Sequence, residues 1–151
     1  MKITMAAEYA VRCVLYLAKQ GQGALVNRQE IANHANIPDT FLAKIAQDLA
    51  KAGIISIKQG ARGGYTLQRP PAEVTMLEVV EAIIGEISLN ECTTKASFCA
   101  ASPYCSANVV WIQARDQLRK TLREANFAIL AQGGACFPIL VPPTAPSENS
   151  P

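Results

Sequence analysis

Residues 27–67 contain the clearest structural signals of the chain and read NRQEIANHANIPDTFLAKIAQDLAKAGIISIKQGARGGYTL. Asn27 followed by Glu30 is typical of a helix N-terminus and predicts a short helix to about residue 35. The tight turn ANIP follows, and Pro38 fits the start of a second helix that Gly53 terminates. Two short apolar runs flank the glycine-rich QGARGG, and they predict a β-hairpin with strands near 54–57 and 65–67.

A further helix is predicted before this stretch, from a cap at Thr4 to about Lys19. A short helix, a tight turn and a polar-faced helix together make a helix-turn-helix, and the hairpin behind them is a wing. The sequence therefore predicts a winged DNA-binding domain over residues 1–71. In the helix that starts at Pro38, four apolar side chains are expected to face inward: Phe41, Leu42, Ile45 and Leu49.

The charge distribution supports binding to a polyanion. Residues 1–69 hold nine basic and four acidic groups, whereas residues 70–151 hold five basic and eight acidic groups. A glycine-rich wing tip that carries Arg62 can approach the DNA backbone or enter the minor groove, and the exposed side chains of the second helix can meet base edges. The predicted DNA contacts are Arg28, Thr40, Ala43, Lys44, Gln47, Lys51, Lys58 and Arg62.

The second half of the chain predicts three further segments. Thr75 and Glu78 form a second capping pair for a helix to about Ile84, and residues 72–105 comprise this linking helix and a cysteine-containing loop. One long helix for dimerisation is predicted from about 106 to 132, where Gly133 and Gly134 end it, within the segment 106–134. The proline-rich residues 135–151 predict a disordered tail. The expected dimer seam has spacings of three and four: Trp111, Ala114, Leu118, Leu122, Ala125 and Ile129. The predicted fold is mainly α-helical with a small β-hairpin wing.

Composition excludes several classes of function. A chain of 151 residues with half of them apolar can build one core, and no apolar run approaches the length of about 20 residues that spans a bilayer. Glu8 and Arg12 interrupt what would be the apolar part of a signal peptide, so a soluble, cytoplasmic protein is expected. With a single histidine, His34, no catalytic constellation is recognisable, and we predict a protein that is not an enzyme.

Three of the five cysteines lie on one segment, NECTTKASFCAASPYCSAN, at residues 90–108. Cys92, Cys99 and Cys105 are separated by six and five residues, which matches neither paired CxxC zinc ligands nor the run found in ferredoxins. Thiolates spaced this widely suit an iron–sulfur cluster, although unligated cysteines in a loop remain the simpler alternative. Cys13 beside an apolar stripe is expected to be buried, and Cys136 near the end is expected to be an incidental thiol.

Four motifs together resemble the Rrf family of bacterial transcription regulators: MKITMAAEYAVRCVLYLA, GARGGYTL, TMLEVVEAI and the triple-cysteine loop. The resemblance covers about residues 1–130, and the family includes the iron–sulfur sensors IscR, NsrR and RirA. It implies a winged-helix homodimer held by the long C-terminal helices. It also implies a [2Fe–2S] or [4Fe–4S] cluster on Cys92, Cys99 and Cys105, near the dimer interface.

The resemblance leaves the fourth cluster ligand open. IscR-like members have a histidine three residues after the third cysteine, where this chain has Asn108, a poor iron ligand. NsrR-like members use an acidic residue near the start of the first helix of the other subunit, and Glu8 stands at that position. Glu8 also suits the helix dipole without any metal. His34, solvent or a small molecule are the alternatives.

These features predict a cluster-dependent transcription regulator, a repressor by family resemblance, that binds a palindromic site in double-stranded DNA as a homodimer. The signal would be iron, cluster supply, nitric oxide or redox state. The alternative keeps the fold but makes the three loop cysteines a metal-free thiol redox switch. A cluster scaffold or carrier is a third possibility, but such a protein has no use for a wing.

Overall fold

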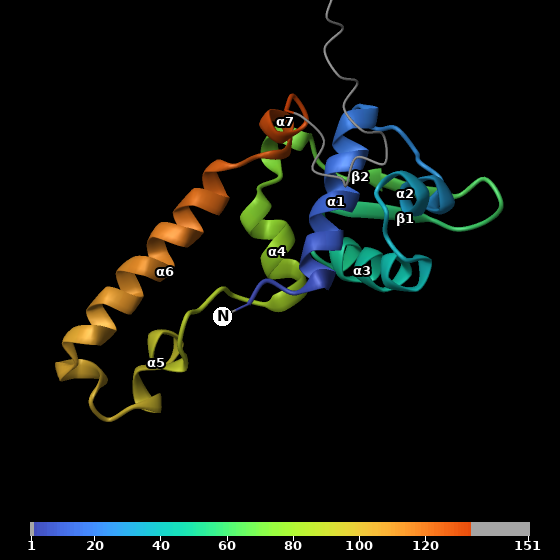
Figure 1. Cartoon of the computed structure of the whole chain (residues 1–151). Helices are drawn as coiled ribbons and strands as arrows, with labels where there is room; N and C mark the ends of the chain where they lie inside the picture. The colour runs from blue at the N-terminus through green and yellow to red at the C-terminus, as the bar shows by residue number, and fades with distance from the viewer. Residues whose placement is uncertain (1, 134–151) are drawn as a thin grey trace, which may run out of the picture.

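The computed structural model describes residues 2–133, and it shows a mostly helical chain with one two-stranded antiparallel sheet (Figure 1). Helices α1, α2 and α3 precede the hairpin, as predicted. The elements of this half are α1 (Met5–Gln20), α2 (Arg28–His34), α3 (Asp39–Lys51), β1 (Ile55–Lys58) and β2 (Gly64–Leu67).

Local sequence explains where these helices begin. The Thr4 side chain accepts a hydrogen bond from the backbone of Ala7, and the Asn27 side chain accepts one from the backbone of Gln29 at 2.8 Å. Pro38 lies at the N-cap of α3, because its missing N–H costs nothing at that position. The predicted winged helix-turn-helix is confirmed.

The hairpin is fastened to the chain just before α2. Tyr65 pairs with Ile57 on β1, and on its other side it exchanges two backbone hydrogen bonds with Val26, of 2.8 and 2.9 Å. Gly64 makes this approach possible, since a Cβ at this position would meet the Val26 carbonyl oxygen at 2.1 Å. The position of the wing therefore depends on a glycine.

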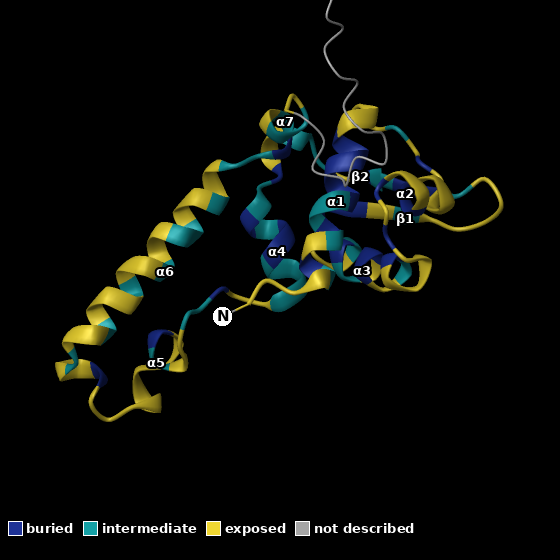
Figure 2. Cartoon of the chain, in the orientation of Figure 1, coloured by how far each residue is buried: buried dark blue, intermediate teal, exposed yellow. Residues whose placement is uncertain are grey.

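The core surrounds α1, which is buried along most of its length (Figure 2). Cys13 is fully buried there, as predicted, and burial raises the pKa of its thiol to about 12. The expectation that Phe41 faces inward is wrong, because its side chain is 47% exposed. Leu42, one position further along the helix, occupies the inward stripe, and the Phe41 ring instead lies edge-on to Tyr9, with 5.7 Å between the ring centroids.

The linking segment follows the prediction at its start. Thr75 and Glu78 form the expected capping box: the Glu78 backbone donates to the Thr75 hydroxyl at 3.2 Å, and the Thr75 backbone donates to the Glu78 carboxylate at 3.0 Å. The predicted loop contains three short turns instead of being irregular throughout. The elements here are η1 (Pro71–Glu73), α4 (Met76–Ile84), α5 (Glu91–Thr94), η2 (Ala96–Phe98) and η3 (Ser102–Tyr104).

The prediction of one continuous helix from 106 to 132, within the segment 106–134, is wrong. Two helices, α6 (Ser106–Glu124) and α7 (Phe127–Leu130), are separated by an extended residue at Ala125. The backbone there pairs with the entrance to α4: Met76 donates to Ala125 at 2.8 Å, and Phe127 donates to Val74 at 3.0 Å. Phe127 is fully buried, and burial of this large ring in the core explains why the helix is interrupted.

The expected dimer seam also needs correction. Ala125 and Ile129 lie beyond the break, so they do not continue the stripe on α6. Leu118 and Leu122 are half-buried against apolar side chains of their own chain, and the side chains they cover belong to Ala7, Leu77, Val80 and Ile87. The apolar side chains that α6 leaves exposed gather at its start: Val109, Val110 and Trp111.

Helix α6 runs as an arm beside α4, and the cysteine loop lies at the end of the arm far from the hairpin (Figure 1). None of the helices in residues 2–133 combines the length and hydropathy that crossing a bilayer requires. The predicted tail at 135–151 and Cys136 lie outside the described residues.

Candidate functional site

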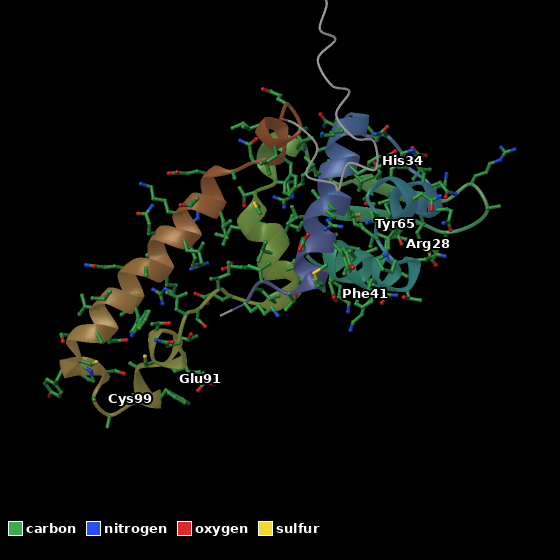
Figure 3. The ribbon with its side chains drawn as sticks, in the orientation of Figure 1. Arg28, His34, Phe41, Tyr65, Glu91 and Cys99 are labelled. Atoms are coloured by element: carbon green, nitrogen blue, oxygen red, sulfur yellow. The ribbon has the colours of Figure 1, made fainter. Side chains whose placement is uncertain are left out.

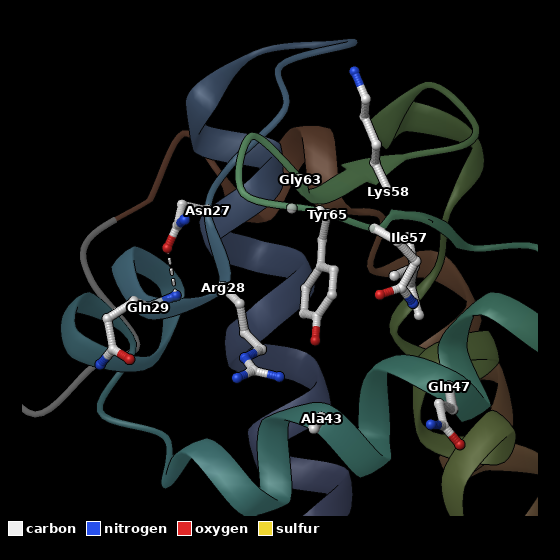
Figure 4. Close-up of a pocket in the computed structure, with 12 residues that line it drawn as sticks. Asn27, Arg28, Gln29, Ala43, Gln47, Ile57, Lys58, Gly63 and Tyr65 are labelled. Atoms are coloured by element: carbon white, nitrogen blue, oxygen red, sulfur yellow. Dashed lines mark hydrogen bonds between the residues drawn. The ribbon is translucent and has the colours of Figure 1, made fainter.

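A groove of about 460 Å³ lies between the start of α2, helix α3 and the hairpin (Figure 4). Four of the predicted DNA contacts line it, two of them on the same face of α3. Those four residues are Arg28, Ala43, Gln47 and Lys58. The helix-turn-helix and the wing thus form one continuous surface, which carries two cations and the amide of Gln47.

Arg28 is one of the two cations that line this groove. As the first residue of α2 it pairs with Asp39 at the start of α3, with 3.1 Å between Nε and Oδ1. Its guanidinium lies beside the Tyr65 hydroxyl (Figure 4). Burial raises the pKa of Tyr65, and the positive charge of Arg28 partly offsets this effect. About half of the Arg28 side chain is exposed, so the guanidinium remains accessible to an anion.

The other predicted contacts lie around the groove instead of in it. Thr40 and Lys51 are exposed at the two ends of α3, and Arg62 is exposed in the turn of the hairpin. Lys44 lines a separate groove of about 410 Å³ between α3, the start of α1 and the end of α4. The structure therefore does not group Lys44 with Ala43 and Gln47.

Sequence reasoning overlooked Tyr65 and Gln59 as lining residues of the groove. Tyr65 was interpreted only as part of a strand. Strand alternation places Tyr65 on the same side as Ile57, its cross-strand partner, and this periodicity was the available signal. Asn27 also lines the groove, but its side-chain oxygen already caps α2.

The three loop cysteines are distributed over the turns at the end of the arm. Cys92 belongs to α5, Cys99 follows η2, and Cys105 is the N-cap of α6. All three are free thiols; Cys92 and Cys105 are half-buried, and Cys99 is exposed far from Arg28 and Tyr65 (Figure 3). Within residues 2–133, no three His, Cys, Asp or Glu side chains are gathered closely enough to hold one metal ion.

Two polar groups of the cysteine loop are buried without a hydrogen-bond partner among the described residues. Asn108 donates through Nδ2 to the Ser102 carbonyl at 3.4 Å. Its Oδ1 atom and the Ser102 hydroxyl are both buried, and neither has a hydrogen-bond partner among the described residues. Buried polar atoms without partners are costly. Thiolates are the usual protein ligands of iron–sulfur clusters. The residue types of the loop therefore suit such a group, although the three thiols are not gathered around one point in the described part of the chain.

The candidates for a fourth ligand do not join these thiols within one chain. Glu8 is exposed in the first turn of α1 and pairs with Arg12 one turn later. His34 is exposed, with its Nδ1 atom 3.0 Å from the Glu30 carbonyl oxygen. His34 and Cys99 lie at opposite ends of the molecule (Figure 3), so His34 cannot complete a site on the loop of its own chain. His34 is a surface group on α2.

Comparisons with known proteins agree with this geometry. The family model Rrf2, described as an iron-dependent transcriptional regulator, matches residues 3–133. The HTH-type transcriptional regulator NsrR of Shouchella clausii is 31% identical over 106 residues, covering 70% of this chain and 71% of that protein.

Two solved structures share the fold. CymR, the global cysteine regulator of B. subtilis, is 24% identical with a TM-score of 0.74, over 89% of this chain and 99% of its own. The oxidized form of CymR from Staphylococcus aureus is 27% identical with a TM-score of 0.67, over the same shares of the two chains. Since the family model spans nearly every described residue and NsrR matches over two thirds of both chains, this chain belongs to the Rrf2 family of DNA-binding transcription regulators, which are not enzymes.

Proposed function

We propose that the protein regulates transcription as a homodimer, and that its cysteine loop is a sensing element built to hold an iron–sulfur cluster. The observation that carries this proposal is the composition of the loop. It combines three free thiols with two buried polar atoms that have no hydrogen-bond partner within residues 2–133, at the end of an arm that is anchored in the DNA-binding half. A segment with these properties gains stability from a ligand that it encloses.

On the DNA side, α3 would enter the major groove. Ala43 and Gln47 are four residues apart and share the groove face, so they would meet base edges. Arg28 and Lys58 line the same groove, and Arg62 extends from the hairpin, so these cations would contact phosphates or the minor groove.

On the sensing side, Cys92, Cys99 and Cys105 would hold the cluster as thiolates. The group would supply chemistry that responds to redox state, nitric oxide or iron. Because the short turns η2 and η3 separate the three cysteines, backbone rotations at the ends of these turns would draw the thiols together. Glu8 of the partner subunit is the proposed fourth ligand, since Glu8 is exposed in the first turn of a helix.

The dimer would cover the apolar start of the arm. Val109, Val110 and Trp111 are 45–60% exposed on consecutive positions of α6, close to the loop. Contiguous exposed apolar side chains mark interaction sites in soluble proteins. A second copy packed against this patch would bring its own α1 towards the loop, as ligation by the partner's Glu8 requires.

Anaerobic purification tests the sensing element. The full chain should be coloured, contain iron and sulfide, and bind a palindromic operator in gel shifts with an affinity that depends on the cluster. Cys99→Ser should remove the cluster. Cys13→Ala should retain it, because Cys13 is buried in the core. A colourless wild-type protein without iron would refute the proposed cluster.

A metal-free thiol switch is the second candidate function. The similarity to CymR, of which an oxidized form has been solved, favours it. In that case the iron-free protein would change its operator affinity when a mild thiol oxidant is added, and Cys99→Ser would lose this response. Iron content therefore separates the two proposals.

A further inference from the structure

Two arginines on one face of α6 form hydrogen bonds with two different segments of the same chain, α5 and α4. Arg115 and Arg119 are four residues apart, and their side chains are only 18% and 23% exposed. Arg123, one turn later on α6, differs from these two arginines: it is exposed and has no partner among the described residues. Arg115 and Arg119, both partly buried, are named here the arginine clamp.

Arg115 holds the segment that carries the first loop cysteine. Its Nη1 atom donates to the backbone carbonyl of Thr93 at 2.6 Å, one residue after Cys92. Thr93 is buried, and its hydroxyl donates to the Asn90 carbonyl at 2.6 Å, which closes the turn of α5. Asp116 fixes the guanidinium from the other side, at 2.7 and 2.8 Å. The backbone beside Cys92 is therefore bonded to a side chain that is itself held in place.

Arg119 holds the other end of the linking segment. It donates to both carboxylate oxygens of Glu81 on α4, at 3.0 and 3.2 Å, and to Glu86 at 3.3 Å. The same Glu81 carboxylate accepts the backbone N–H of Ile87 at 3.0 Å, where the chain leaves α4 for the loop. The Arg119 guanidinium thus connects α6 to α4 and to the backbone segment that leads into the cysteine loop.

Helix α4 in turn belongs to the core of the DNA-binding half. Val79 and Val80 are buried, and Val79 packs in the same cluster as the core of α1. Helix α5 is therefore connected to α4 through Arg115 and Arg119, on two neighbouring turns of α6, and α4 supports the winged domain. A movement of α5 would be transmitted along this path. The remaining ion pair of α6 among the described residues, Lys120 with Glu124, stays within the helix and reaches neither segment.

We propose that the arginine clamp couples the cysteine loop to the winged helix, and that Arg115 is a positioning residue for Cys92. This inference rests on the proposed function, because it assumes that the loop is the sensing element. Any group that occupies the Cys92 thiol and shifts α5 would strain the hydrogen bond between Arg115 and Thr93. The strain would then change how α6 sits on α4.

Thiol reactivity in the reduced, metal-free full chain tests the positioning role without any cluster. We expect Arg115→Ala to raise the alkylation rate of Cys92 on the order of tenfold, because a charge-assisted hydrogen bond that closes α5 is lost. Peptide mass spectrometry resolves each cysteine, so the buried Cys13 serves as an internal reference for global unfolding. Arg115→Lys should restore part of the protection, and the matched control Arg123→Ala should leave the rate unchanged.

An unchanged Cys92 rate in Arg115→Ala would refute the positioning role. Equal acceleration at Cys92 and Cys13 would refute it as well, since it would show only a loss of overall stability.

Operator affinity tests the coupling. In a background of Cys99→Ser, Cys105→Ser and Cys136→Ser, alkylation is confined to Cys92 on the surface. The affinity of this protein for the operator should change on alkylation by a factor within the usual range of allosteric coupling, about 5–150-fold. The added Arg115→Ala should bring that factor close to one. If alkylation still changes the operator affinity by the same factor in Arg115→Ala, the clamp is refuted and the sensing loop is not. If alkylation of Cys92 leaves the operator affinity unchanged while Arg115 is intact, both the clamp and the sensing loop are refuted.

Discussion

Replacing Phe127 by alanine should destabilise the winged domain, although Phe127 lies 60 residues beyond the hairpin in the sequence. The ring is fully buried in the main core, and the surrounding backbone is held by hydrogen bonds of 2.8 and 3.0 Å to the entrance of α4. A pinned backbone cannot collapse into the space that the ring vacates. We therefore expect the usual cost of a Phe→Ala substitution in a core, about 3–5 kcal/mol.

Urea denaturation followed by far-UV circular dichroism measures this loss. With a slope of about 2 kcal/mol per M, the midpoint should fall by about 2 M. Ile129→Ala is the matched control, because Ile129 lies in the same short helix and is 60% exposed; its effect should stay within about 0.5 kcal/mol. A fall of less than 0.5 M for Phe127→Ala, or an equal fall for Ile129→Ala, would show that α7 is not integrated in the core.

Three other variants test the wing, the phosphate contacts and the acid limb of stability. Gly64→Ala places a Cβ 2.1 Å from the Val26 carbonyl oxygen, so it should cost about 1–3 kcal/mol and abolish operator binding in gel shifts; retained binding would contradict the dependence of the wing on this glycine. Lys51→Ala should reduce the slope of log affinity against log salt by about 2 per dimer, because each lost phosphate contact contributes about 0.9; an unchanged slope would remove Lys51 from the contacts. Burial pushes the pKa of Glu78 up, but hydrogen bonds from the helix N-cap and Arg69 more than offset this, so its pKa is lowered. The stabilisation by Glu78 is then present above its unfolded pKa and is lost as the pH falls through the lower folded value, and Glu78→Gln should flatten the decline of the thermal midpoint below about pH 4.5; an identical decline in both proteins would exclude this contribution.

Local signals in the sequence were sufficient to predict the order of the helices and strands in the winged half. Capping side chains such as Asn27 and Thr75 act within three residues, and glycines in a hairpin act on their own backbone. The elements that they mark can therefore be predicted without knowledge of the tertiary structure. The prediction for Cys13 succeeded for a similar reason, because the apolar stripe beside it identifies the buried face of α1.

The errors arose where distant contacts override helical periodicity. Leu118, Leu122, Ala125 and Ile129 are spaced as in a continuous seam, yet the chain breaks that helix so that Phe127 can enter the core. Spacing alone does not say whether an apolar stripe covers its own chain or a second copy. The lining of the groove could not be predicted from local sequence either, because Tyr65 comes close to α2 and α3 only when the hairpin folds over them.

The backbone pairing of Thr75 with Asn126 means that the arm can change in length and sequence without disturbing the winged domain. The chain leaves the winged domain after Thr75 and returns to it at Asn126, at adjacent backbone positions, so residues 86–124 form an excursion whose two ends are held close together. Insertions tolerated at such closed ends do not disturb the domain that bears them. A loop of different length or composition can therefore be accommodated at the end of this arm while the winged domain keeps its geometry. Under the proposed function, such an exchange would place the same DNA site under the control of a different signal.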